Sequence, residues 1–178
     1  MAASTPAQGS HPRRTPARSG PVDLDRRTVL AGALFGVGVA GSMIDLFVFH
    51  LALQWHHFYD RSTTAVAITA DGFFHAVTWS ITVWGLFLLA DVRRRAPVRW
   101  GRWTGAVLAG VGGFQLFDGV VDHKLLRLHQ VRYGVEDIWV YDAAWIGSAV
   151  VVLLAGLLVL RRTRPARPRG GRGAAARG

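Results

Sequence analysis

Four long apolar segments, separated by stretches of a different composition, constrain the fold of this 178-residue chain most strongly. Each segment is long enough to cross the hydrocarbon core of a membrane, which takes roughly 20 residues of helix. The segments cover residues 29–53, 64–90, 104–126 and 140–160. The sequence therefore predicts an all-α integral membrane protein, a four-helix bundle that contacts the lipid bilayer through a domain of residues 28–162.

The arginines fall mainly in three blocks that alternate with pairs of these segments. Five precede Val29, five lie within residues 93–102, and seven follow Leu160. Positively charged loops are retained on the cytoplasmic side of a membrane. The pattern predicts that the N- and C-termini are both cytoplasmic, and it accounts for the net charge of +10 without a nucleic-acid partner.

The two ends of the chain contain few large apolar side chains. Residues 1–27 are rich in Pro, Ala, Ser and Arg, and residues 163–178 are rich in Arg, Gly and Ala. Such segments bury too little surface to fold, so both are predicted to be disordered tails. Arg26 and Arg27 before an apolar run imitate a twin-arginine export signal, but the run is too long for one and favours an anchor helix.

Several cofactor classes are excluded by composition. The chain has no cysteine and only two methionines, which argues against thiolate zinc sites, iron–sulfur clusters and Met-rich copper(I) carriers. A nucleotide fingerprint is also absent from the sequence. A bound metal would therefore need His, Asp or Glu ligands.

The first and third apolar segments repeat one pattern of polar residues. In each copy, four residues separate an Asp from a His, and five residues separate that His from a second one. The residues are Asp45, His50 and His56 at the first segment, and Asp118, His123 and His129 at the third. A weaker correspondence relates Asp71 and His75 in the second segment to Asp142 and Trp145 in the fourth. The repeat predicts two helix pairs related by a pseudo-two-fold axis along the membrane normal.

Helix geometry places these polar residues in the outer half of the bundle. With a rise of about 1.5 Å per residue, Asp45, His75 and Asp118 share one level, roughly 22 Å from the cytoplasmic end. On an ideal α-helix His50 and His123 lie off the face shared by the other residues of the pattern. Either these two histidines face a flanking side of the bundle, or a local distortion of the helix turns them toward the shared face.

Buried ionisable residues are costly in a membrane, so a cluster of them indicates a functional site. Imidazole and carboxylate donors suit zinc, iron, copper(II) or manganese. The predicted metal ligands are His50, His56, His75, His123, His129, Asp71 and Asp118. The predicted supporting or proton-relay residues are Asp45, Asp122 and Asp142. His57 is interpreted as a solvated neighbour of His56 and not as a ligand. Metal binding by a metal-handling or accessory subunit is favoured over catalysis.

Three other hypotheses remain open. Haem held by His50 and His123 would make an electron-transfer subunit, although haem does not need so many carboxylates. A metal-dependent hydrolase could use Asp71 or Asp122 as general base. A proton or ion transporter would need polar groups below the cluster, where the segments are almost wholly apolar. The accessory subunit could act with another membrane protein or as a homo-oligomer.

A purely structural interpretation also remains. Buried carboxylates could pair with basic side chains only to lock the helices together. The pairs in question join Asp45, Asp118 and Asp122 to His75, Lys124 and Arg127.

Three sequence motifs resemble those of a bacterial family of predicted membrane proteins known as domain of unknown function 2243. They are QWHH at 54–57, ADGFFH at 70–75 and FQLFDGVVDHK at 114–124, and the likeness continues through LRLHQVRYG at 126–134. The resemblance covers residues 29–162 and implies a multi-pass protein of the bacterial plasma membrane. Leu46 departs from it, because a glycine like Gly119 is expected there. The family brings no established activity.

Overall fold

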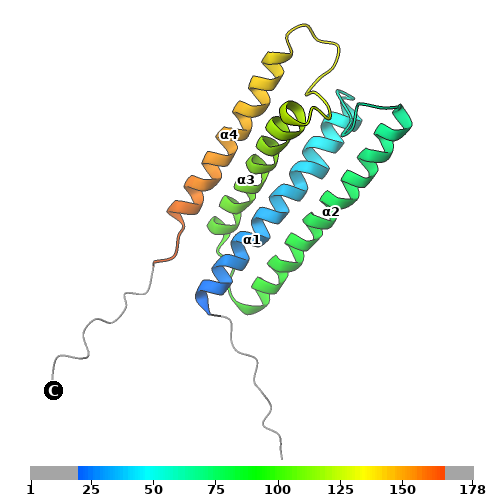
Figure 1. Cartoon of the computed structure of the whole chain (residues 1–178). Helices are drawn as coiled ribbons and strands as arrows, with labels where there is room; N and C mark the ends of the chain where they lie inside the picture. Colours follow the sequence, from blue (N-terminus) through cyan, green and yellow to red (C-terminus); the bar gives the residue numbers. More distant parts are fainter. Residues whose placement is uncertain (1–19, 167–178) are drawn as a thin grey trace, which may run out of the picture.

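The computed structural model describes residues 20–166, and the described part of the chain is helical in four long segments and contains no strand (Figure 1). The elements are α1 (Pro21–Val39), η1 (Ala40–Ala52), α2 (Thr64–Arg95), α3 (Trp100–Phe117), η2 (Asp118–Leu125) and α4 (Ile138–Arg162). The two η elements are π-helices that continue α1 and α3 without a break. All four segments are long and apolar enough to cross a membrane, which confirms the predicted all-α membrane fold.

The first helix begins earlier than the sequence predicted. Residues 21–27, expected in the N-terminal tail, form the first turns of α1. Proline suits this position because the first turn of a helix does not use its N–H. The Arg102 guanidinium of α3 holds the added turns, since it donates to both carboxylate oxygens of Asp25 at 2.9 and 2.8 Å. Residues 1–19 and 167–178 of the two predicted tails lie outside the described residues.

The helices lie in the order α2, α1, α3, α4 (Figure 1). The central helices α1 and α3 contact each other, and each contacts one outer helix. Only 17% of the most apolar stretch of α2 and of α4 is buried, against 50% for the stretch in Asp23–Ala52. The outer helices expose large apolar side chains such as Phe73, Phe87 and Val151, as expected for lipid contact. The α1–α3 interface joins the pair α1 and α2 to the pair α3 and α4.

Glycines let the central helices approach closely. A Cβ added to Gly110 would lie 2.3 Å from the Ala33 carbonyl oxygen of α1, and one added to Gly112 would lie 2.3 Å from the Leu153 nitrogen of α4. Small residues at such contacts allow backbone-to-backbone packing in membranes. Gly105 is also close to the Leu160 nitrogen of α4, whereas Gly113 has no atom of another element within 4 Å.

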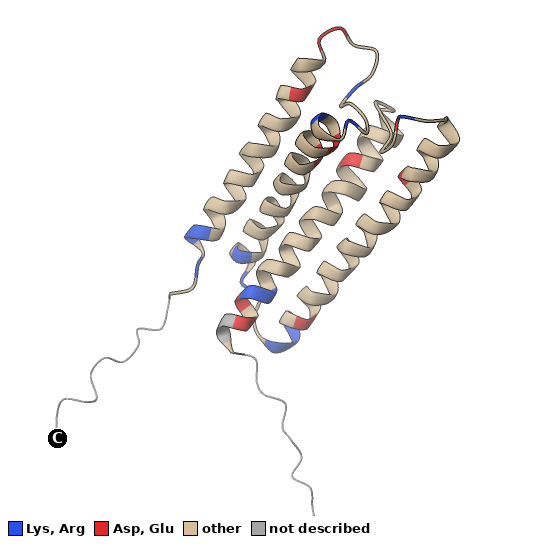
Figure 2. Ribbon diagram, viewed as in Figure 1, with Lys and Arg blue, Asp and Glu red and all other residues tan. Residues whose placement is uncertain are grey.

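The start of α1 and the end of α4 lie at the same end of the molecule (Figure 1). Figure 2 shows arginines gathered at that end, where α2 ends and α3 begins. The loops after η1 and η2, which contain His56 and His129, lie at the opposite end.

Candidate metal centre

The two π-helices bring each Asp onto the same helix face as the His five residues later. A π-helix bonds residue i to residue i+5, and short π-helical segments occur frequently at functional sites. η1 carries Asp45 and His50, and η2 carries Asp118 and His123. The helix distortion left open by the sequence is therefore the correct alternative, and it joins all three residues of each repeat.

The chain reverses after each π-helix through a non-glycine residue with positive φ. Gln54 in the first half and Arg127 in the second both have φ of 52°. His56 and His129 follow these reversals, and each is held by the loop of the opposite half. His56 Nδ1 donates to the Val131 carbonyl at 2.7 Å, and His129 Nδ1 donates to the Phe58 carbonyl at 2.9 Å. These contacts are equivalent under the repeat, so the duplication extends to the loops.

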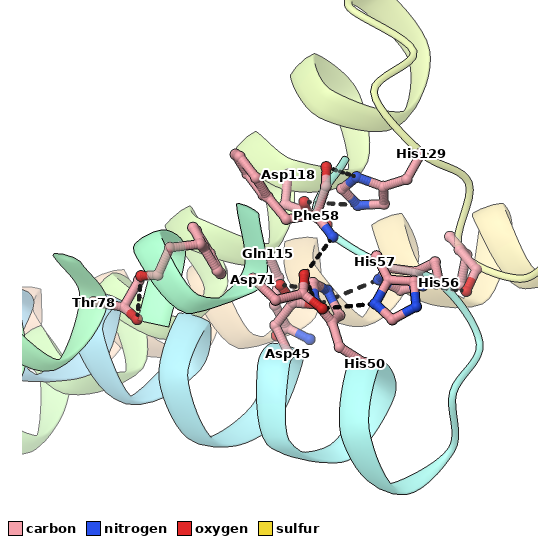
Figure 3. A network of polar contacts seen from close by, with 12 residues as sticks. Asp45, His50, His56, His57, Phe58, Asp71, Thr78, Gln115, Asp118 and His129 are labelled. Carbon is pink, nitrogen blue, oxygen red and sulfur yellow. Dashed lines mark hydrogen bonds and ion pairs between the residues drawn. The ribbon is translucent and has the colours of Figure 1, made fainter. Parts of the chain in front are cut away.

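Each half places one carboxylate against two imidazoles (Figure 3). Asp45 lies 3.5 Å from His50 Nε2 and 3.6 Å from His56 Nε2. Asp118 lies 3.1 Å from His123 Nε2 and 3.5 Å from His129 Nε2. All six side chains are at most 3% exposed. The named residues of each half thus converge with their donor atoms in a buried space.

The two halves meet where His56 stacks on His129. Their ring centroids are 4.6 Å apart and their planes differ by 11°. His50 lies 4.6 Å from His56, and His123 lies 4.6 Å from His129. The four imidazoles therefore form one continuous array. Ligand atoms of two groups lie close enough to hold an ion: His56, His123 and His129, and Asp45, His50 and His56. The two groups share His56, and Asp118 contacts His123 and His129 without belonging to their group.

The stacked pair differs in its affinity for a proton. Burial lowers the pKa of His56, and the nearby Asp45 carboxylate does not reverse this. Burial also opposes charge on His129, but the Asp118 carboxylate raises its pKa above the ordinary value. Of the two stacked rings, His129 therefore has the higher affinity for a proton.

The first half contains a supporting network around Asp71. Its Oδ1 accepts from His50 Nδ1 at 2.8 Å and from the Phe58 N–H at 2.8 Å, and its Oδ2 accepts from His57 Nδ1 at 2.7 Å (Figure 3). The structure thus places Asp71 behind His50, where it contacts Nδ1 atoms of imidazoles and not the Nε2 atoms that Asp45 and Asp118 face. His57 belongs to this network, which sequence reasoning missed because nothing in the QWHH motif distinguishes it from a solvated neighbour.

The second half lacks this support. His123 Nδ1 has no hydrogen-bond partner within residues 20–166, and the Trp145 ring lies 5.7 Å from the imidazole. Asp142, the expected counterpart of Asp71, forms an ion pair with Lys124 instead. The two halves therefore share the contacts between one Asp and two Nε2 atoms. They differ at Nδ1 of the first His, which is hydrogen-bonded in His50 and, among the described residues, not in His123.

Two other predicted residues lie apart from the two groups. His75 is half-buried on α2 beside Trp79 and belongs to neither group. Asp122 is buried at the position that matches Phe49 of the first half. Within the described residues, the ion pairs expected from the locking interpretation do not form: Asp45 pairs with His50 and His56, and Asp118 pairs with His123 and His129.

Fold and site together define a four-span membrane protein with a duplicated, buried histidine–carboxylate centre. The chain belongs to the family described as predicted membrane protein (DUF2243), which it matches over residues 31–163. Comparisons with curated proteins and with solved structures found no match.

Proposed function

We propose that this protein binds transition-metal cations at the outer end of its helices, one cation in each half of the centre. The ligands of the two halves are Asp45, His50 and His56, and Asp118, His123 and His129. The observation that carries the proposal is the orientation of the buried imidazoles toward the two carboxylates.

Three of these imidazoles have their ring proton assigned by a neighbouring acceptor. His50 Nδ1 faces a carboxylate oxygen, and His56 and His129 Nδ1 face backbone carbonyls. A neutral imidazole that donates from Nδ1 presents a lone pair at Nε2. When these rings are neutral, each Nε2 lone pair faces a carboxylate oxygen, so two acceptors point at each other. A cation between them removes the conflict, and histidine ligands of metals commonly donate their other N–H in this way.

The distances favour shared ligation over direct hydrogen bonding. A charge-assisted N–H to carboxylate bond is about 2.7–2.9 Å long. Two ligands of one tetrahedral zinc ion, each about 2.0–2.2 Å from it, lie roughly 3.3–3.6 Å apart. The four observed N to O separations of 3.1 to 3.6 Å agree better with the second arrangement.

The alternative is that the histidines are charged and pair directly with the carboxylates. This would place four imidazolium rings in one buried array against Asp45, Asp118 and Asp71. The stacked His56 and His129 would then hold like charges 4.6 Å apart between ring centroids. Like charges this close in a buried site disfavour the doubly charged state.

A metal-handling or accessory role fits better than transport. Below the centre, the hydroxyls of Ser42, Thr78 and Thr82 donate to backbone carbonyls of their own helices. They offer no continuous relay toward the opposite end. With both termini at the arginine-rich end, we infer that this end is cytoplasmic and that the centre faces outward from the bacterial plasma membrane.

The test is elemental analysis of protein purified in detergent, beside its absorption spectrum. We expect zinc, copper, iron or manganese to copurify with the wild-type chain and no Soret band. A Soret band would favour the haem alternative, held by His50 and His123. Protein that is metal-free and that also takes up no added zinc or cobalt would contradict the proposal.

Asp71→Asn is expected to weaken metal binding in the first half only. Asparagine keeps the shape of the side chain but loses the charge that orients His50. Loss of such a supporting partner typically lowers metal affinity by about 10- to 100-fold. Competition with a chelator measures this, with Asp142→Asn as the matched control because Asp142 pairs with Lys124 outside the centre. Equal weakening in both variants would contradict the assigned role.

A further inference from the structure

A pocket of about 450 Å³ adjoins the second half of the centre. Its lining comes from the end of η2 and the loop that follows: His123, Lys124, Arg127, His129, Gln130, Tyr133 and Ile138. Two of these residues, His123 and His129, belong to the proposed second-half ligands. The pocket therefore connects the surface at this end of the protein with the centre.

One nitrogen atom in the wall of the pocket has no partner within the described range. The His123 side chain is 1% exposed; its Nε2 lies 3.1 Å from Asp118, and its Nδ1 has no hydrogen-bond partner among the described residues. The corresponding His50 differs, because its Nδ1 is engaged by Asp71, which also binds His57 and the Phe58 N–H. The first half is thus closed by protein at the position where the second half adjoins a pocket.

The pocket also carries positive charge. Lys124 is neutralised by Asp142, whereas Arg127 is exposed and has no ion pair among residues 20–166. Its equivalent in the first half is the uncharged Gln54, which has the same φ of 52°. The charge is therefore a feature of the second half alone.

We propose that the second half binds a small anion, either an inorganic anion or a simple carboxylate, that enters this pocket and coordinates the cation beside His123. Arg127 attracts the anion, and the first half does not bind it. This inference rests on the proposed function, because it requires a cation in the second half. Two imidazoles and one carboxylate leave a coordination position free, as in zinc sites that accept an external ligand.

The experiment uses the full-length protein in detergent, loaded with Co(II), whose visible absorption reports its ligands. Cobalt content is measured first, and azide or formate is then added. We expect a saturable spectral change that arises from one of two bound ions. The change should persist in Asp45→Asn and disappear in Asp118→Asn, because only the second half accepts the anion.

Variants of Arg127 test the role of the pocket. Arg127→Gln places the residue of the first half in a backbone conformation that Gln54 already adopts, so the fold should persist. We expect about tenfold weaker azide binding in Arg127→Gln and near wild-type binding in Arg127→Lys, with unchanged cobalt content in both. Bound cobalt without any azide response, or a response that survives in Asp118→Asn, would overturn the anion site and leave the proposed function intact. Failure to bind cobalt would overturn both.

Discussion

Asp118→Asn is expected to remove one of two bound cations, and Asp45→Asn is expected to remove the other. Asparagine has nearly the same volume as aspartate, but it is neutral and offers one oxygen in place of two. Each variant therefore loses the only carboxylate that faces the two imidazoles of its half at 3.1 to 3.6 Å. The double variant should bind no metal. Zinc per chain after dialysis measures the loss.

The control for these variants is Asp142→Asn, which also removes a carboxylate near this end of the protein. It should retain both cations, because Asp142 pairs with Lys124. Full metal content in the double variant would contradict the assigned ligands. Complete loss in each single variant would instead indicate one shared site.

Gly112→Ala is expected to destabilise the protein, whereas Gly113→Ala is not. A Cβ at Gly112 would lie 2.3 Å from the nitrogen and 2.7 Å from the Cα of Leu153, and these backbone atoms cannot rotate away. Overpacking of this kind typically costs about 1–3 kcal/mol. At Gly113 no atom of another element lies within 4 Å, and alanine improves helix propensity by about 1 kcal/mol.

The thermal unfolding midpoint in detergent distinguishes the two glycines. Gly112→Ala should unfold at a lower temperature than wild type, and Gly113→Ala should unfold at the same or a higher temperature. Equal midpoints for the two variants would contradict the close α3–α4 contact.

The sequence predicts the spans and the duplication well, because both depend on local pattern. Length and apolar content identify the four helices, and the repeated spacing from Asp45 and from Asp118 identifies the two halves. The start of α1 is less predictable, because it depends on Arg102 reaching Asp25 from another helix. Contacts of that kind leave no signal in the composition of residues 1–27.

The facing of His50 and His123 depends on a change of helix type. Periodicity reasoning assumes 3.6 residues per turn, and on that assumption neither histidine aligns with the Asp five residues before it. The Asp-x4-His spacing fits the i to i+5 bonds of a π-helix, and its occurrence in both halves was the available signal. The support of His50 by Asp71 was not predictable, because it joins separate segments through a loop.

Native mass spectrometry of the full-length protein, stripped of metal and then given one to four equivalents of zinc, tests the central claim most directly. The two carboxylates and their four imidazoles predict stepwise addition of two zinc ions to the wild-type chain, with no further specific addition. A chain that binds no zinc, or that binds a single ion lost equally in Asp45→Asn and Asp118→Asn, would contradict a duplicated metal centre.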